Sequence, residues 1–294
     1  MKKITAINQA IQKAISVVEA RKKKKLEEPD YNAALAIEMP PLLNSCGAFP
    51  DVRFGGCYIH QSPKVTFAGK YEDPSTCELG DLLAICHEVV DGDDRYNAAL
   101  IQWKRLKLGF EIISGKELKQ LDLYEHWPKF EMNWCGCEFD IYPKTVTPGA
   151  QYGLIQEEKP VSLFCTIPMM ELAVSDSTPF ARFLINLMKW QTGRPFVLTD
   201  YPDANDEWSR IINHLIWHTL TKHFNRRNIK MEDEPRTPKD LLKMLVKDDV
   251  KGDDRAVYPE SENDEGDISI LYIEKDWKKE WMGDEGPEID KASV

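Results

Sequence analysis

The sequence predicts an α/β fold in which a mixed central β-sheet is flanked by helices and followed by C-terminal helical additions. Helical periodicity at the start of the chain is followed by three β-rich stretches, a further helix and more strand-like segments. The order helix, three strands, helix, strand is typical of an α/β or α+β core. With 294 residues, 42% of them hydrophobic, the chain can bury a large core.

The N-terminal part of the chain is predicted to be helical. Residues 4–25 repeat isoleucine at helical spacing and end in a basic run. A second helical stretch covers residues 30–43. We expect it to break at Pro40 and Pro41, because proline lacks the backbone amide that a helix interior uses.

The middle of the chain alternates between strand and helix patterns. The three β-rich stretches are 56–67, 79–90 and 96–104. Asp91-Gly-Asp-Asp between the last two predicts a β-hairpin. A helix at 114–130, with Ser114 as its expected N-cap, comes next. Later strand-like segments are 138–142, 150–156 and 161–167, and later helical segments are 178–191 and 206–225.

These patterns divide the chain into four parts. They are an N-terminal helix (1–29), a core (30–170), a helical part of the same domain (171–247) and an acidic tail with one strand candidate at 268–273 (248–294). Most of the net charge of −11 lies in the tail, which we expect to be solvated and to repel phosphate. The overall charge argues against a chain that coats nucleic acid, but it leaves room for a local basic groove.

Composition also bears on the cellular compartment. The sequence has no apolar run long enough to span a bilayer and no apolar stretch of a signal peptide at its start, so no membrane association is expected. Its seven cysteines are interpreted as reduced thiols rather than a disulfide framework. A cytoplasmic protein is therefore expected.

Three polar residues at the ends of two predicted strands are the candidate catalytic group. Asp81 stands at the start of one apolar strand, and Gln102 and Lys104 stand two apart at the end of the next. Residues two apart on a strand share a face, and the hairpin would set Asp81 beside them. Phosphodiester hydrolysis uses a metal ion that activates water, and Mg²⁺ prefers carboxylate and amide oxygens. A lysine at such a site can steady the developing charge.

The order Asp81, hairpin, Gln102-x-Lys104 resembles the active-site signature of the PD-(D/E)xK, restriction-endonuclease-like phosphodiesterases. The resemblance covers roughly residues 30–125. It implies a restriction-endonuclease-like core, a Mg²⁺ or Mn²⁺ ion held by Asp81 and Gln102, and Lys104 as the catalytic lysine. It also implies endonuclease activity, with DNA favoured over RNA as the substrate.

Two further matches extend the resemblance. Many family members carry a glutamate on the helix before the first strand, which implies Glu38 as a catalytic and metal-binding residue. Members similar to the RecB type carry Gln-x-x-x-Tyr after the lysine strand, and Gln120 and Tyr124 match that spacing. Residues four apart on a helix share a face, so both are expected to contact nucleic acid. Arg105 and Lys107 would line the adjoining basic groove.

A looser likeness points to uncharacterised bacterial proteins, some of them suspected of roles in defence against phage. It lies in residues 60–64, 123–128 and 149–152. This likeness implies an anti-phage defence effector and allows for a protein partner or activator.

The competing interpretation is a nuclease-like fold without turnover that binds nucleic acid or protein. Gln102 stands where most family members have an acidic residue, and a neutral ligand weakens a metal site. A Gln-x-Lys at a strand end is usually a solvated edge, and an Asp after Gly usually caps a turn. Only the ordered set of residues favours catalysis. A metal titration separates the two interpretations, because a scaffold does not respond to Mg²⁺.

Cysteines and histidines elsewhere in the chain are candidate zinc ligands by residue type. Cys135 and Cys137 lack the spacing of paired structural zinc ligands, and buried cysteine usually behaves as a small hydrophobe. His214 and His218 lie four apart on a predicted helix, but no Glu follows His214, so the zincin motif is absent. The sequence by itself therefore favours packing roles for these residues.

Overall fold

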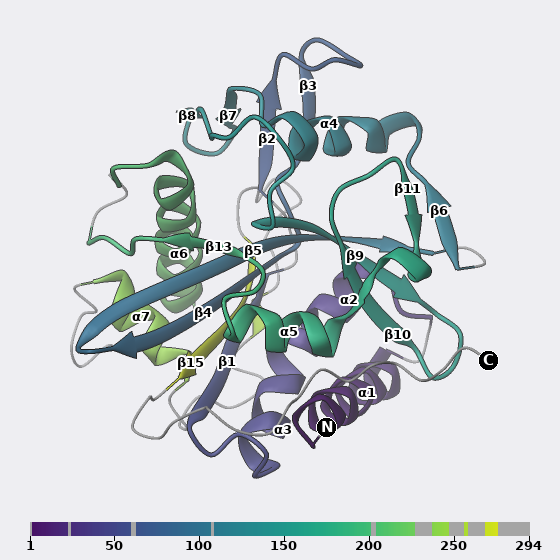
Figure 1. The fold of residues 1–294 in the computed structure, drawn as a ribbon, viewed down its shortest axis with the longest axis vertical. Coiled ribbons are helices and arrows are strands. Elements are labelled where there is room, and N and C mark those ends of the chain that lie inside the picture. The colour runs from purple at the N-terminus through teal and green to yellow at the C-terminus, as the bar shows by residue number, and fades with distance from the viewer. Residues whose placement is uncertain are drawn as a thin grey trace.

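The computed structural model describes residues 2–22, 25–59, 63–106, 109–200, 204–226, 237–246, 256–257 and 268–275. A large mixed β-sheet crosses the molecule, and helices cover both of its faces (Figure 1). The predicted mixed α/β class is therefore confirmed. Within the described residues, no helix is both long and apolar enough to cross a bilayer.

In the described part of the chain, nine strands form the central sheet. Its order is β12-β10-β9-β5-β4-β15-β1-β14, with β13 paired to the other half of β5. The strands are β1 (Val52–Ile59), β4 (Leu82–Val90), β5 (Asp93–Arg105), β9 (Ala150–Gln156), β10 (Ser162–Thr166), β12 (Thr178–Pro179), β13 (Arg194–Phe196), β14 (Ala256–Val257) and β15 (Ser269–Lys275).

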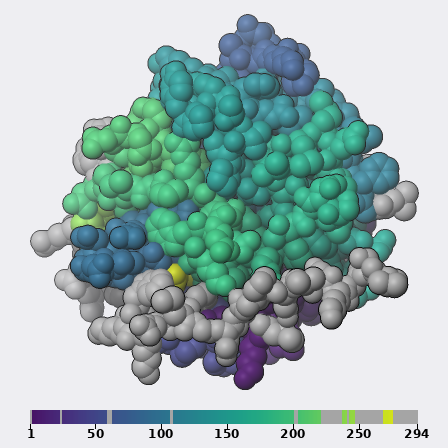
Figure 2. Space-filling view, in the orientation of Figure 1, coloured from purple at the N-terminus to yellow at the C-terminus, as the bar shows by residue number. Residues whose placement is uncertain are grey.

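Two smaller sheets accompany the central one. The larger has the order β3-β2-β7-β8, and the other pairs β6 with β11. Their strands are β2 (Lys64–Phe67), β3 (Ser75–Glu78), β6 (Phe110–Ile112), β7 (Phe130–Met132), β8 (Cys137–Phe139) and β11 (Glu171–Ala173). The β2–β3 hairpin projects from the body at the top of the space-filling view (Figure 2).

Helices occupy the two faces of the central sheet. They are α1 (Lys2–Lys22), α2 (Glu28–Ala33), the π-helix η1 (Ala34–Glu38), α3 (Met39–Ser45), the 3₁₀ helix η2 (Gly115–Glu117), α4 (Leu118–His126), the 3₁₀ helix η3 (Val174–Asp176), α5 (Phe180–Met188), α6 (Glu207–Arg226) and α7 (Pro238–Met244). One core joins α1, α2, η1, α3 and α5 to one face. The other core joins α4, α6, α7 and the β3-β2-β7-β8 sheet to the opposite face.

The predicted hairpin forms as β4 and β5. Its antiparallel register pairs Val90 with Asp93 at the turn and Leu82 with Ile101 at the far end. Side chains alternate between the two cores along β4, with Leu82 in one and Leu83 in the other. After α4 the chain returns as β9, which lies parallel to β5. This order brings the start of β4 and the ends of β5 and β9 to the same end of the sheet.

Two boundaries differ from the sequence-based expectation. Pro40 and Pro41 do not end the helix, because they lie in the first turn of α3, where the proline nitrogen is not needed as a donor. The β-rich stretch at 56–67 is split between β1 of the central sheet and β2 of the smaller one. Residues 60–62 between them are outside the described ranges.

The strand expected within an acidic tail is in fact a central strand. β15 lies between β4 and β1, parallel to β4 and antiparallel to β1. Residues 269–273 are buried, and Ile270 and Tyr272 face the α6 side of the sheet. The interpretation of 248–294 as a separate solvated tail is therefore wrong at β15. The short apolar run at 268–273 predicted the strand but not its place in the central sheet, because strand pairing is set by contacts far away in the sequence.

Candidate active site

Asp81 and Gln102 meet at the end of the β4–β5 hairpin. Nε2 of Gln102 donates a hydrogen bond to Oδ2 of Asp81 at 2.6 Å, and the backbone amide of Trp103 donates to the same oxygen at 2.7 Å. The backbone amide of Asp81 in turn donates to the carbonyl of Ile101 at 2.8 Å. The hairpin thus places the two residues side by side, as the sequence predicts.

The carbonyl oxygen of Gln102 is the polar atom of this pair left without a partner. Gln102 is only 3% exposed, and its Oε1 is buried with no hydrogen-bond partner among the residues that the structure describes. Buried polar atoms are nearly always satisfied, so an unpaired one needs an explanation such as an ion or a ligand. The direction of the amide is set by Asp81, whose carboxylate requires the NH₂ group to face it.

Lys104 lies on the same face of β5 as Gln102, two residues further along the strand. Its Nζ is 2.9 Å from Oε1 of Glu117 in η2, and its side chain is only 11% exposed. The strand holds the stem of this lysine, whereas Glu117 is 41% exposed and comes from a short 3₁₀ helix. Lys104 is therefore a largely buried lysine on the Gln102 face of β5, with Glu117 as its ion-pair partner.

Acidic side chains gather around Lys104. Burial raises the pKa of Glu28 above its usual value, Lys104 lowers it, and Glu117 and Glu78 raise it again. The carboxylates of Glu28 (α2), Glu78 (β3) and Glu117 (η2) therefore lie close enough to interact electrostatically with one another. Lys104 and Arg105 are the cations that act on these carboxylates.

Asn32 connects α2 to the backbone of Asp81. Its Nδ2 donates to the carbonyl of Asp81 at 3.1 Å, and its Oδ1 accepts from Nε1 of Trp103 at 2.7 Å. The Trp103 ring is fully buried and packs over Gly153 of β9, where any Cβ would overlap the indole. The helix, both hairpin strands and β9 are thus locked together at Asp81.

Glu28 of α2 is a carboxylate near Lys104 that the sequence-based prediction missed. It lies close to Glu117 and Glu78 as well, four residues before Asn32. Glu38 is at the far end of η1, and its Oε1 pairs with Nη1 of Arg21 at 2.5 Å. The structure therefore gives Glu38 an ion pair with α1. Helical spacing from Asn32 was the signal for Glu28 that the sequence offered.

Gln120 and Tyr124 do lie beside the site, but as buried supports. Tyr124 is fully buried, and its hydroxyl donates to the carbonyl of Leu79 at 2.6 Å. Gln120, one turn earlier on α4, is 5% exposed. Tyr124 therefore positions the Leu79-Gly80 segment that leads into Asp81. The expectation that these side chains contact nucleic acid does not agree with their burial.

The expected basic groove is only partly visible. Arg105 lies at the end of β5 and forms an ion pair with Glu157. Glu157 also pairs with Lys25 at 2.8 Å, and both line a pocket of about 530 Å³ together with Lys159. Lys107 lies outside the described residues. The cations near the site are therefore matched by carboxylates.

The donor set suits a hard cation, although the carboxylates are not gathered into a tight ligand shell. Asp81, Glu28 and Oε1 of Gln102 offer the oxygen donors that Mg²⁺ takes. Among the residues that the structure describes, the one group of three acidic, histidine or cysteine side chains close enough to share an ion lies elsewhere, at Cys135, Cys137 and His214. Asp81, Gln102 and Glu28 therefore fit Mg²⁺ by donor chemistry.

Comparisons with known proteins add no relative. No protein-family model matches the chain, and neither a curated protein nor a solved structure matches it.

Proposed function

We propose that this protein is a metal-dependent endonuclease that hydrolyses DNA at Asp81, Gln102 and Lys104. The observation that carries the proposal is the buried Oε1 of Gln102, which has no hydrogen-bond partner among the described residues, on a side chain whose Nε2 donates to the Asp81 carboxylate. An oxygen in that position lacks a partner that a cation would supply. The chain order of α2, β1, the β4–β5 hairpin, α4 and a parallel β9 supports a restriction-endonuclease-like core.

Each residue has a distinct task in this proposal. Asp81 and Gln102 supply oxygen ligands, with Glu28 of α2 as a further carboxylate near Lys104. The Mg²⁺ ion, when bound, neutralises the scissile phosphate and lowers the pKa of water. Lys104 stabilises the negative charge that develops on the phosphate oxygens. Asn32, Tyr124 and Trp103 do not take part in the chemistry but fix the Asp81 backbone and carboxylate.

A second candidate function is a binding module that has kept this arrangement without catalysis. The observation in its favour is that Oδ2 of Asp81 already accepts two hydrogen bonds, from Gln102 and from the Trp103 amide. A carboxylate satisfied in this way has less need of a cation. This candidate binds nucleic acid or protein with no response to Mg²⁺.

The test is a cleavage assay of the full chain on circular and linear DNA and on RNA. We expect circular DNA to be nicked or linearised in Mg²⁺ or Mn²⁺ and to stay intact in chelator. Lys104→Ala and Asp81→Asn should each lower the cleavage rate by more than about 100-fold, as removal of a transition-state stabiliser does. Lys129→Ala is the matched control, because Lys129 also pairs with a glutamate, Glu138, but on the surface.

Three outcomes decide between the candidates. Loss of cleavage in Lys104→Ala with full activity in Lys129→Ala supports the endonuclease. Full cleavage by Lys104→Ala moves the chemistry to other residues. Metal-independent DNA binding without cleavage by the wild type supports the binding module.

A role in phage defence belongs to the same proposal. Plaque counts in cells that express the wild type or Lys104→Ala test this role.

A further inference from the structure

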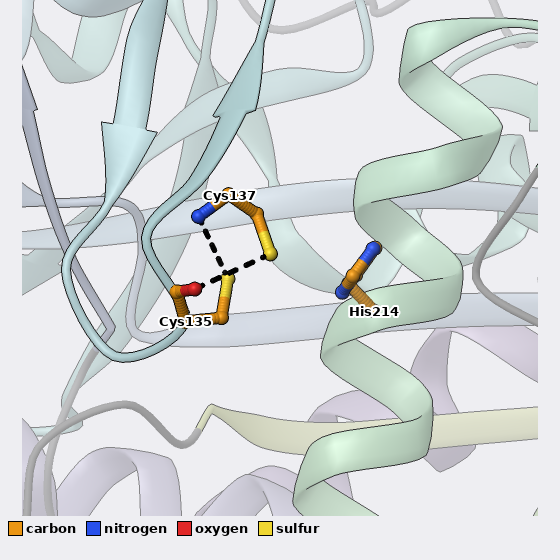
Figure 3. A group of neighbouring side chains, drawn as sticks. All are labelled: Cys135, Cys137 and His214. Carbon is orange, nitrogen blue, oxygen red and sulfur yellow. Dashed lines mark hydrogen bonds between the residues drawn. The ribbon is translucent and has the colours of Figure 1, made fainter.

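Two cysteines and a histidine meet at a place that the proposed nuclease chemistry does not use. Cys135 and Cys137 lie in the turn between β7 and β8 and at the start of β8, and His214 lies on α6. Their sulfur and imidazole nitrogen atoms all lie within 4.8 Å of one another, and all three side chains are half-buried. Figure 3 shows the two cysteines on the hairpin and the His214 ring facing them from the helix.

The hairpin turn has the shape that brings two sulfurs to one side. Gly136 between the cysteines has φ +63°, which glycine adopts without strain and other residues rarely do. The backbone amide of Cys137 donates to Sγ of Cys135 at 3.3 Å. An amide that donates to sulfur stabilises a thiolate and orients it, as hydrogen bonds to metal-binding side chains commonly do.

Contacts between the hairpin and α6 hold the third ligand in place. Trp134 stacks on His218 with ring centroids 3.7 Å apart, and Phe139 meets His214 edge-on at 5.5 Å. The Arg210 guanidinium lies 4.4 Å from the centre of the Phe139 ring and donates to the carbonyl of Glu138. The helix therefore docks on the hairpin through aromatic packing, and a positive charge stands near the two sulfurs.

The donor atoms define the kind of ion. Two thiols and one imidazole are borderline-soft ligands, which suit Zn²⁺ and are poor ligands for Mg²⁺ or Ca²⁺. The edges of a zinc tetrahedron built from such ligands are about 3.5–3.8 Å. The three donor atoms already lie within 4.8 Å of one another, so small side-chain rotations would bring them to these distances.

We propose that Cys135, Cys137 and His214 bind one Zn²⁺ ion, with the fourth coordination position open to water or an exchangeable ligand. The Cys-x-Cys spacing by itself does not predict this site, because the third ligand comes from a helix far along the chain. The ion would join α6 to the β3-β2-β7-β8 sheet. Since β3 leads directly into Leu79, Gly80 and Asp81, the ion would also brace one wall of the candidate active site.

The test is a Co²⁺ and Zn²⁺ titration of the full chain, purified with reductant and stripped with a chelator. We expect one equivalent of Co²⁺ to produce a sulfur-to-cobalt charge-transfer band and tetrahedral d–d bands, and Zn²⁺ to displace it. Cys135→Ser, Cys137→Ser and His214→Gln should each weaken binding by more than about 100-fold, since loss of a second-shell partner alone costs 10–100-fold. Cys46→Ser and His126→Ala are the controls, because these residues are distant in sequence and Cys46 is exposed.

The readouts keep folding and binding separate. Circular dichroism of the metal-free variants should match the wild type, and His214→Gln serves as the deciding variant if a cysteine variant does not fold. Cobalt bands that survive in His214→Gln would overturn the proposal, as would octahedral spectra without charge transfer. A Cys135–Cys137 disulfide found by mass spectrometry in the reduced preparation would also overturn it. Asp81→Asn should keep the cobalt bands, so failure of the nuclease proposal leaves this result unaffected.

Discussion

The side-chain amide of Gln102 donates a 2.6 Å hydrogen bond to the carboxylate of Asp81. This bond explains why a neutral residue is stable at a position where a second acid would face Asp81 at the same distance. Gln102 is 3% exposed, so little water is available to screen such a pair. The bond also fixes which end of the amide faces Asp81, so that Oε1 takes no part in it and has no hydrogen-bond partner among the described residues.

Gln102→Glu should destabilise the metal-free protein and make its stability depend on Mg²⁺. The substitution replaces a charge-assisted hydrogen bond with carboxylate repulsion, which costs about 1–3 kcal/mol. An ion between the two carboxylates would restore most of this loss. Urea unfolding with chelator and with Mg²⁺ measures both effects.

Gln191→Glu is the control for this substitution, because Gln191 is exposed and its change should stay within about 0.5 kcal/mol. If Gln102→Glu is as stable as the wild type in chelator, the Asp81–Gln102 bond is absent in solution. If Mg²⁺ restores nothing, Asp81 and residue 102 do not share an ion.

Glu28→Gln should stabilise the protein at neutral pH. Burial is the main reason that the pKa of Glu28 is raised above 4.5, and Glu117 and Glu78 add to it. A raised folded-state pKa gives stability that is complete below the unfolded value and is lost as pH rises through the folded value. The variant should therefore be more stable than the wild type at pH 7, and the two should converge as pH falls toward 4.5.

Thermal unfolding from pH 4 to pH 8 measures this difference. Glu131→Gln is the control, because Glu131 is exposed on β7, and its substitution should change stability by less than about 0.5 kcal/mol. A Glu28→Gln protein that is less stable than the wild type at pH 7 would show that Glu28 makes a favourable ionic contact. Repulsion from Glu117 and Glu78 would then not dominate at Glu28.

The hairpin at Asp81 could be predicted because its connection is short. A two-residue turn at Asp91 and Gly92 forces β4 and β5 to pair, and pairing sets Asp81 opposite Gln102. Alternation along one strand then puts Lys104 on the same face. These are local rules, and each can be read from a few neighbouring residues.

The remaining site residues depend on helix rotation and on long-range pairing. Glu28 lies four residues before Asn32, which is about 40° around the helix. Glu38 is the last residue of the π-helix η1 and pairs with Arg21 of α1. The sequence pattern showed a helix with glutamates but not which face meets the sheet. Placement of β15 between β1 and β4 depends on contacts with residues about 190 positions away.

Asn32→Leu should destabilise the fold and loosen Asp81. The substitution leaves the buried Trp103 Nε1 without an acceptor and the Asp81 carbonyl without its donor. Two lost bonds in a buried place cost about 2–4 kcal/mol. Denaturant unfolding measures the loss, and Ser45→Ala, which removes an exposed side-chain bond to Leu42, should change stability by less than about 0.5 kcal/mol. A change in Asn32→Leu as small as that of the control would mean that Asn32 does not brace the site.

Truncation at the C-terminus should have opposite results on either side of β15. Deletion of residues 276–294 removes no strand or helix that the structure describes, so melting temperature should stay close to that of the full chain. Deletion of 248–294 removes β15, whose side chains fill both cores and whose Lys275 Nζ pairs with Oε2 of buried Glu88 at 2.8 Å. A buried acid left without its cation alone costs about 3–5 kcal/mol, so this shorter chain should not fold.

Circular dichroism and melting curves of the two truncated chains provide the measurement. A cooperative transition in the chain that ends at residue 247 would show that β1 and β4 can close the sheet without β15, and that the acidic segment is a separate tail after all.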